Sequence, residues 1–322
     1  MLTLEQITQP ISKDLVLFDE AYRQALSSQQ ELLNEALKYV HQQRGKLIRP
    51  ILTLLAAQLC HSVSDKTIDT AVAMEMLHTA SLIHDDVVDD SPTRRSQPAI
   101  HAKWTNKIAV LVGDYIFAKV LIRMGSMHNN RILLILSDMV KALVEGELTQ
   151  LHYDQSMFID EVTYFDIIEH KTARLFAACA EAGAASALAS PKQISALKQY
   201  GLLLGLCFQL KDDILDYSDA EDIGKPTLSD IRDGKVTLPL IVALQRAPQA
   251  EAEATKKIIT EAAPRFEQSV LSFVLRYDGI GYANQKMQEL RAQAVQALDC
   301  FHDSLTKESL IQLLTYSINR LY

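Results

Sequence analysis

Residues 64–90 of the chain read SDKTIDTAVAMEMLHTASLIHDDVVDD. Apolar residues recur in this stretch at positions 68, 72, 76, 80 and 83, with companions at 71, 74, 77 and 82. Because this spacing follows the turns of an α-helix, the stretch is predicted to form one long helix with a buried face. Ser64 or Asp65 would cap its start, since a short polar side chain can accept a hydrogen bond from a free backbone N–H group there.

Helical periodicity of the same kind covers most of the 322-residue chain. Long apolar stretches run over 107–125, 131–154 and 193–219, and no proline lies between Ala99 and Ser190. We find no convincing alternation of apolar and polar residues that would indicate a strand. The predicted fold class is therefore all-α, with loops at 91–100, 186–192 and 219–234. No Gly/Ser linker divides the chain, so a single domain over residues 1–322 is expected.

Composition argues against several classes of protein. A formal charge of −8 makes nucleic acid a poor partner, although local basic clusters can still bind small anions. No apolar run reaches about 18 residues, so no membrane span is expected. The first residues lack the pattern of a signal peptide, which favours the cytoplasm. Cys60, Cys179 and Cys207 lie in apolar surroundings at no metal-binding spacing, and we interpret them as buried thiols.

Two acid-rich stretches each end one of the predicted helices. The first is LIHDDVVDD at 82–90, and the second is LKDDILDYSD at 210–219. On a helix Asp85 faces Asp89 and Asp212 faces Asp216, and like charges at this spacing cost roughly a few tenths of a kcal/mol per pair. The helix dipole also disfavours negative charge at a C-terminal end. Bound Mg²⁺ would reverse this cost, because it takes oxygen ligands and often joins carboxylates to substrate phosphates.

A solvated acidic helix end is the alternative interpretation of one such stretch. Two copies, each after an apolar helix, favour the metal site. A carboxylate-bridged di-iron centre has weaker support, because it needs Glu-x-x-His pairs on facing helices. Glu75 and His78 form one such pair, and nothing equivalent accompanies the second acid cluster.

Basic residues stand after both acid clusters and at two further positions. They lie in RGKLIRP at 44–50, SPTRRSQP at 91–98, HKTARLF at 170–176 and IGKPTLSDIRDGKVTLP at 223–239. Each taken alone is more often a surface charge, although Lys171 opens an apolar segment with Thr172 beside it. Together they indicate a site where acids hold metal and bases hold phosphate oxygens, since Arg and Lys both bind phosphate well.

These motifs, in order from about residue 45 to 241, resemble those of the trans-isoprenyl diphosphate synthases. The matching stretches are GKLIRP, LIHDDVVDDSPTRR, VGDYIF, GEL.QL at 146–151, KTARLF, FQLKDDILDY and GKPTLSDIRDGKVTLPL. The long-chain polyprenyl branch, such as the octaprenyl diphosphate synthases, is the most similar. The resemblance implies the isoprenoid synthase fold, which is one antiparallel helical bundle around a deep apolar cavity and is usually a homodimer.

The same resemblance implies a role for each matching residue. Two or three Mg²⁺ ions would bind at Asp85, Asp89 and Asp212, supported by Asp86, Asp213 and Asp216. The allylic diphosphate would contact Arg94, Lys171, Thr172, Gln209 and Lys225, with Lys235 near it. Isopentenyl diphosphate would be held by Lys46, Arg49, His78 and Arg95. The catalytic group would be these six aspartates with Lys171 and Arg94, whereas His84 is interpreted as structural. Without the family, His78 would be interpreted as a buried helix histidine.

Three residues depart from the usual pattern of that family. Arg44 stands where a first glycine is common, Leu47 where a second basic residue is common, and Ser96 where glycine usually follows the arginine pair. None of them replaces a ligand position. They affect the expected geometry of the loops and leave the expected chemistry unchanged.

The implied reaction joins an allylic diphosphate, such as farnesyl diphosphate, head-to-tail with isopentenyl diphosphate. We expect a long all-trans product, octaprenyl diphosphate for a quinone side chain, with transient membrane contact at its release. The small residues Ala80 and Ser81 would leave a channel open before Asp85, with Leu77 and Met76 below them; close helix packing is the alternative reason for their size. The alternative functions are a shorter-chain synthase, a terpene cyclase and a noncatalytic subunit of a two-component synthase.

Overall fold

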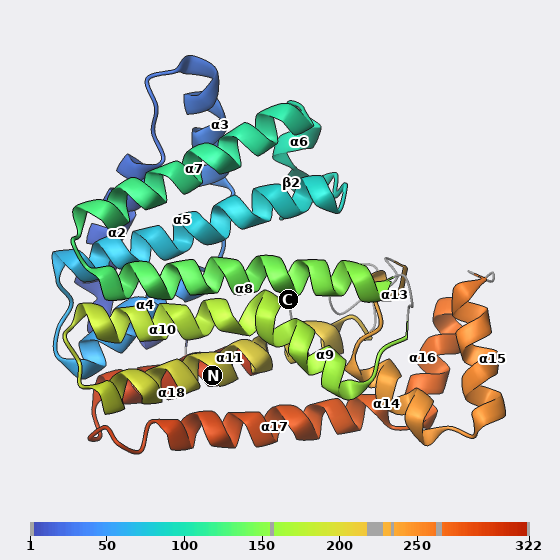
Figure 1. Cartoon of the computed structure of the whole chain (residues 1–322). Helices are drawn as coiled ribbons and strands as arrows, with labels where there is room; N and C mark the ends of the chain where they lie inside the picture. Colours follow the sequence, from blue (N-terminus) through green and yellow to red (C-terminus); the bar gives the residue numbers. More distant parts are fainter. Residues whose placement is uncertain (1–2, 155–157, 218–227, 233–234, 262–265, 321–322) are drawn as a thin grey trace.

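The structure, a computed structural model, describes residues 3–154, 158–217, 228–232, 235–261 and 266–320 (Figure 1). Helices make up nearly all of this part of the chain, which confirms the predicted all-α class. The helices up to residue 154 are α1 (Leu4–Ile7), the 3₁₀ turn η1 (Gln9–Ile11), α2 (Ser12–Ala25), α3 (Glu31–Gln42), α4 (Ile48–Cys60), α5 (Asp65–Val88), α6 (Ile100–Lys103), α7 (Asn106–Ser126) and α8 (Asn130–Asp154). Those that follow are α9 (Glu161–Ile168), the π-helical turn η2 (Glu169–Ala173), α10 (Arg174–Ser186), α11 (Pro191–Leu215), α13 (Ser229–Arg232), α14 (Leu238–Arg246), α15 (Gln249–Thr260), α16 (Phe266–Arg276), α17 (Gly279–Ala297) and α18 (Leu305–Asn319).

The long helices lie side by side in one bundle, and short turns join α7 to α8 and α10 to α11 (Figure 1). α10 is central to this bundle, because it packs against α4, α8 and α11. Gly183 of α10 allows α4 to approach closely, since a Cβ atom there would collide with the backbone of Thr53. α15 and α16 form a separate pair at one end of the bundle, where α14 leads into them.

The stretch 64–90 folds as predicted and carries the first acid cluster. Ser64 is the N-cap of α5, and it exchanges hydrogen bonds with Thr67 in a capping box; a cap of this kind stabilises a helix by about 1 kcal/mol. The helix is buried on most of its sides, because α2, α4, α7 and α10 pack against it. It ends at Val88, with Asp89 as its C-cap residue. Its acidic end therefore stands at one end of the bundle.

A short β-hairpin lies within the predicted loop 91–100, so the expectation of no strand is wrong there. β1 (Thr93–Arg94) pairs antiparallel with β2 (Gln97–Pro98). Four paired residues are too few to show an alternating pattern in the sequence. Arg95 and Ser96 form the turn, with φ angles of 52° and 61°, as a type I′ turn requires. Such angles favour glycine, which explains why the family usually has glycine at the position of Ser96.

The other two departures from the family pattern also have defined places. Arg44 forms an ion pair with Asp19 of α2, and Leu47 adopts a left-handed conformation, with φ of 54°, immediately before α4. Cys60, Cys179 and Cys207 are buried free thiols, as expected, whereas Cys300 is exposed. Of the helices in the described ranges, none has the length and apolar character needed to cross a membrane.

Candidate active site

The first acid cluster divides into residues with different surroundings. Asp86 is only 4% exposed, and its Oδ1 accepts a hydrogen bond of 2.9 Å from Nε of Arg94 and a second one from Nη2. These two charge-assisted hydrogen bonds to one carboxylate oxygen fix the β-hairpin against the end of α5. Burial first, and the charge of Glu147 of α8 next, raise the pKa of Asp85 to about 6. The nearby ammonium group of Lys171 opposes this rise.

Lys171 is held by two residues of α8 that the sequence interpretation did not assign. Its Nζ lies 2.8 Å from Oε2 of Glu147 and donates to Oε1 of Gln150 at 3.0 Å. Lys171 itself lies in the π-helical turn η2, and such turns are frequent at functional sites. Gly146 lets α8 approach this turn, because a Cβ atom there would stand 2.6 Å from the Cβ of His170. The motif GEL.QL at 146–151 therefore supplies the partners of Lys171.

The second acid cluster also contains one deeply buried member. Asp213 is 2% exposed; it accepts hydrogen bonds from Tyr164 and, at 2.8 Å, from Nε2 of Gln209. Burial raises the pKa of Asp213 to about 8, the charge of Asp230 adds to the rise, and the two donated hydrogen bonds oppose it. Asp216 accepts a hydrogen bond from the backbone of Asp230 at 3.1 Å. These two aspartates therefore hold neighbouring segments of the protein in place through hydrogen bonds.

Asp212 is more exposed and faces a group of basic residues. Its Oδ1 lies 2.9 Å from Nη2 of Arg320, near the end of the described chain. The same arginine stacks on the ring of Phe208, with its Cζ 3.7 Å from the ring centroid. Lys46 lies close by, since burial first and the charge of Arg320 next lower its pKa. Asp212, which the sequence assigned to metal, thus lies near Lys46, which it assigned to isopentenyl diphosphate.

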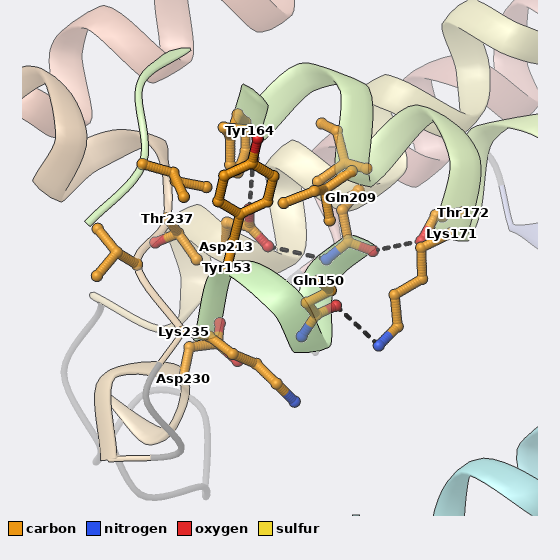
Figure 2. Close-up of a pocket in the computed structure, with 14 residues that line it drawn as sticks. Gln150, Tyr153, Tyr164, Lys171, Thr172, Gln209, Asp213, Asp230, Lys235 and Thr237 are labelled. Carbon is orange, nitrogen blue, oxygen red and sulfur yellow. Dashed lines mark hydrogen bonds between the residues drawn. The ribbon is translucent and has the colours of Figure 1, made fainter. Parts of the chain in front are cut away.

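Several residues assigned to the allylic diphosphate line one pocket of about 170 Å³ (Figure 2). Lys171, Thr172, Gln209 and Lys235 contribute polar groups to it, beside Asp213. Tyr164, Ile167 and Val236 supply part of its apolar wall. Arg94 lies elsewhere, on the hairpin, and Lys225 lies outside the described residues.

Arg49, His78 and Arg95, three of the four residues assigned to isopentenyl diphosphate, lie between α4, α5 and the hairpin, whereas Lys46 lies on the side of Asp212 and Arg320. His78 and Arg95 line a small cavity of about 40 Å³ with Glu75, Asp86 and Arg94, and Arg94 is the residue that the sequence assigned to the allylic diphosphate. Burial, and then the charges of Arg49 and Arg95, hold the pKa of His78 well below its usual value, so this imidazole is neutral. The buried Nε of Arg49 has no hydrogen-bond partner among the described residues. A buried donor without a partner fits an anion-binding site, since leaving it unpaired costs about 1–3 kcal/mol.

The residues assigned to chain length are all buried in α5. Ala80, Leu77 and Met76 are almost wholly covered, and the hydroxyl of Ser81 donates to the carbonyl oxygen of His78 at 2.9 Å. Met76 also borders a separate cavity between α5 and α7. His84 packs against α7, where its ring lies over Gly113 and 3.2 Å from the carbonyl oxygen of Val110. This contact agrees with the structural role expected for His84.

The donor groups present fit a hard divalent cation, which the acid clusters imply. The carboxylates of Glu147 and Asp89 both raise the pKa of Asp85, and a cation would relieve such mutual repulsion. Within the described ranges, no three His, Cys, Asp or Glu side chains approach closely enough to hold an ion by themselves. Mg²⁺ commonly takes one or two carboxylates from a protein and its remaining ligands from substrate phosphates and water.

Four residues of the site were missed by the sequence interpretation: Glu147, Gln150, Tyr164 and Arg320. Glu147 and Gln150 lie in GEL.QL, a motif to which no residue role was given, so a signal for them was present. Tyr164 lies in EVTYFDII at 161–168, where an aromatic residue is also expected of any core helix. Arg320 is distant in sequence from every motif, and only the folded chain brings it to Asp212.

Comparison with known proteins shows one family along the chain. The polyprenyl synthetase family model matches residues 30–274. The all-trans-nonaprenyl-diphosphate synthase (geranyl-diphosphate specific) of Rhodobacter capsulatus is 34% identical over 319 residues, with 98% of each chain covered. The octaprenyl diphosphate synthase of Escherichia coli K12 is 33% identical, with 99% of each chain covered. The structure is also similar to a crystal structure of polyprenyl synthase from Caulobacter crescentus CB15 complexed with calcium and isoprenyl diphosphate, with a TM-score of 0.91. The two sequences are 32% identical, and the match covers 99% of this chain and 98% of that one.

Proposed function

The chain belongs to the polyprenyl synthetase family, and we propose that it is a Mg²⁺-dependent synthase of long-chain all-trans polyprenyl diphosphates. It is a prenyltransferase of isoprene biosynthesis with the all-α isoprenoid synthase fold. The proposed product is octaprenyl diphosphate, made in the cytoplasm for a quinone side chain by one domain spanning residues 1–322. Two relatives named for octaprenyl and nonaprenyl products, similar over nearly the whole chain, support a product of this length.

The observation that carries the proposal is the placement of Lys171 between the acid clusters. Its ammonium group acts on the charge of Asp85 in the first cluster. The adjacent Thr172 donates a hydrogen bond of 2.9 Å to Gln209, which in turn donates to Asp213 in the second cluster. A diphosphate bound here would meet positive charge with carboxylates on both sides. That arrangement suits a diphosphate that is bridged to the carboxylates by metal ions better than it suits a diphosphate or a metal ion bound alone.

In the proposed reaction, the protein binds both diphosphates and stabilises the charge that develops on one of them. Bound Mg²⁺ at Asp85, Asp89 and Asp212 would supply the charge that lets the allylic diphosphate leave. Lys171 and Arg94 add positive charge beside that leaving group. As the allylic C–O bond breaks, its electron pair leaves with the diphosphate, and the double bond of isopentenyl diphosphate forms the new C–C bond. Diphosphate then accepts the proton that is lost.

Arg49, Arg95 and His78 would hold isopentenyl diphosphate in the correct orientation for that attack. Orientation of this kind can contribute several kcal/mol, because it replaces an encounter in solution. Neutral His78 can donate a hydrogen bond to phosphate without adding charge to the two arginines. The apolar side chains of α5, α8 and α11 exclude water, which would otherwise capture the cation.

The direct test is synthesis by the purified chain. With farnesyl diphosphate, isopentenyl diphosphate, Mg²⁺ and detergent, we expect a ladder of products that ends near eight isoprene units, as chromatography of the dephosphorylated products would show. Removing the metal with EDTA should abolish the ladder, and restoring Mg²⁺ should recover it. A cyclic terpene product, or no product without a second protein, would replace the proposal by a terpene cyclase or by a subunit of a two-component enzyme. A ladder that stops at farnesyl or geranylgeranyl length would indicate a shorter-chain synthase.

We also propose that the enzyme is a homodimer that forms through α7 and α8. Exposed apolar side chains are concentrated on these helices: Val110, Leu111, Leu121, Ile122, Leu134, Val144, Leu148 and Leu151. Val144, Leu148 and Leu151 recur at a spacing of four and three residues, which places them on one face of α8. Groups of exposed apolar side chains on one helix face mark protein interfaces more often than solvated faces.

Replacing Leu134 with glutamate is expected to lower the mass in solution from that of a dimer to that of a monomer. A buried, unpaired charge at the interface would oppose association. Light scattering coupled to gel filtration at micromolar concentration would measure the change. Leu275→Glu is the matched control, because Leu275 is similarly exposed but belongs to α16, in the separate pair of helices α15 and α16 (Figure 1). A wild-type monomer would contradict the proposal.

A further inference from the structure

Tyr164 has no role in the function described so far, yet its hydroxyl is tied to the second acid cluster. The hydroxyl donates to Oδ2 of Asp213, and the two side chains come from different helices, α9 and α11. Tyr164 is 3% exposed and Asp213 is 2% exposed. A hydrogen bond to a carboxyl group in such a dry place is stronger than one at the surface. It is therefore suited to fix the position of one helix on the other.

The bond is the first link of a chain of hydrogen bonds that ends beside Lys171 (Figure 2). Gln209 donates from Nε2 to Oδ1 of Asp213 at 2.8 Å, and its Oε1 accepts from the hydroxyl of Thr172 at 2.9 Å. Both oxygens of Asp213 are thus occupied by protein donors. The carboxyl group is already used to hold Gln209 and Tyr164 in fixed orientations.

The order of the helices indicates what this series of hydrogen bonds holds in place. α9 continues without a break into η2 and α10, so Tyr164 and Thr172 lie on one helical segment. Two residues of α11 bind this segment: Asp213 accepts a hydrogen bond from Tyr164, and Gln209 accepts one from Thr172. Lys171 lies between these two points, and its Nζ is tied to α8. A π-helical turn is rarer and less stable than α-helix. It needs such outside bonds to keep one conformation.

We propose that Tyr164 is a positioning residue for prenyl transfer, which acts through Asp213 and Gln209 to hold Lys171 and Thr172 in the orientation that binds the allylic diphosphate. This inference rests on the proposed function, because it names the substrate group that the positioned residues meet. Tyr164 itself touches no reacting atom. A hydrogen bond that only stabilises the core would have the same geometry but no effect on the binding of substrate.

The test is Tyr164→Phe, which removes one oxygen and keeps the ring beside Phe165. The probe is farnesyl S-thiolodiphosphate with Mg²⁺, an analogue of the allylic substrate that cannot ionise readily, and calorimetry measures its binding without turnover. We expect about tenfold weaker binding, which corresponds to about 1.4 kcal/mol. The KM for isopentenyl diphosphate should stay within about twofold, because Arg49 and Arg95 lie outside this chain of bonds.

Tyr282→Phe is a matched control within the same part of the fold. The hydroxyl of Tyr282 donates to Oε1 of Glu161 at 3.0 Å and so ties α9 to α17 by another tyrosine–carboxylate bond. Its loss should leave binding of the analogue within about twofold of wild type, if the effect of Tyr164 passes through Asp213. An equal loss in both variants would show that α9 only needs anchoring, and would overturn the proposal.

A double-mutant cycle with Thr172→Val tests the path itself. That variant cuts the last link, so Tyr164→Phe should weaken binding by less than about twofold when it is added to Thr172→Val. A full second loss of about tenfold would overturn the path, as would wild-type affinity in Tyr164→Phe alone. If Tyr164→Phe unfolds too easily to assay, Tyr164→Met removes the same hydroxyl with a flexible side chain that can fill the space, and it decides the matter in the same way. A wild-type chain that neither binds the analogue nor elongates farnesyl diphosphate would instead reject the proposed function.

Discussion

Replacing Asp85 with alanine is expected to lower product formation by roughly a thousandfold or more, because the site loses a carboxylate that holds the metal and the metal supplies the charge for ionisation. The fold should remain intact. The carboxyl group of Asp85 makes no hydrogen bond to another described residue, and burial raises its pKa to about 6. An acid whose pKa is raised on folding destabilises the folded state above its ordinary pKa. The alanine variant should therefore unfold at the same temperature as wild type or slightly above it.

Asp90→Ala is the matched control for this variant. Asp90 belongs to the same acid cluster, but its side chain is 94% exposed, and its Oδ1 lies 3.8 Å from Nε2 of His101. Its loss should change the rate by less than about twofold, since exposed charges of this kind contribute little. Radiolabelled isopentenyl diphosphate measures the rates, and thermal unfolding followed by circular dichroism measures stability. Normal turnover by Asp85→Ala would reject the assigned site and with it the proposed mechanism.

The sequence predicted most of the fold because the helices depend on local patterns. The N-cap at Ser64 and the apolar spacing along α5 are sufficient to place that helix correctly. The hairpin at 93–98 was missed, because its stability comes from the turn at Arg95 and Ser96 and from its contacts with α3 and α5. One such contact is the hydrogen bond of 2.9 Å from Tyr39 to the carbonyl oxygen of Pro98. The pattern of apolar and polar residues in a four-residue hairpin does not predict a contact with a distant helix.

The residue types of the candidate site could be predicted, but the different surroundings of neighbouring aspartates could not. Asp212 and Asp213 are adjacent in sequence, yet one faces Arg320 and the other is buried against Tyr164. A helix turns by about 100° per residue, so adjacent side chains meet different neighbours. Which neighbours those are depends on packing between helices far apart in the sequence. For the same reason the π-helical turn at Lys171 was not predicted, since its surroundings include Gly146 of another helix, where a Cβ atom would collide with His170.

Replacing Ala80 with phenylalanine is expected to shorten the product, and the longest chains should disappear from the ladder. Ala80 is fully buried in α5, more than one turn before Asp85. If the growing chain passes this position, a ring there would fill the space that the later isoprene units need. Chromatography of the dephosphorylated products would measure the shift, with Ser81→Phe, at the other small residue assigned to the channel, as a second variant. Total turnover should fall much less than product length, because the diphosphate groups bind elsewhere.

Overpacking is the other effect of that substitution, and it must be separated from obstruction of a channel. Inserting a large side chain into a packed core typically costs about 1–3 kcal/mol, whatever its position. Ala109→Phe in α7 is the matched control, because Ala109 is equally buried but lies in a helix that carries no acid cluster. We expect Ala109→Phe to lower stability without changing the product distribution. If Ala80→Phe also leaves that distribution unchanged, the small residues of α5 serve helix packing, and the length of the product is determined at another part of the cavity.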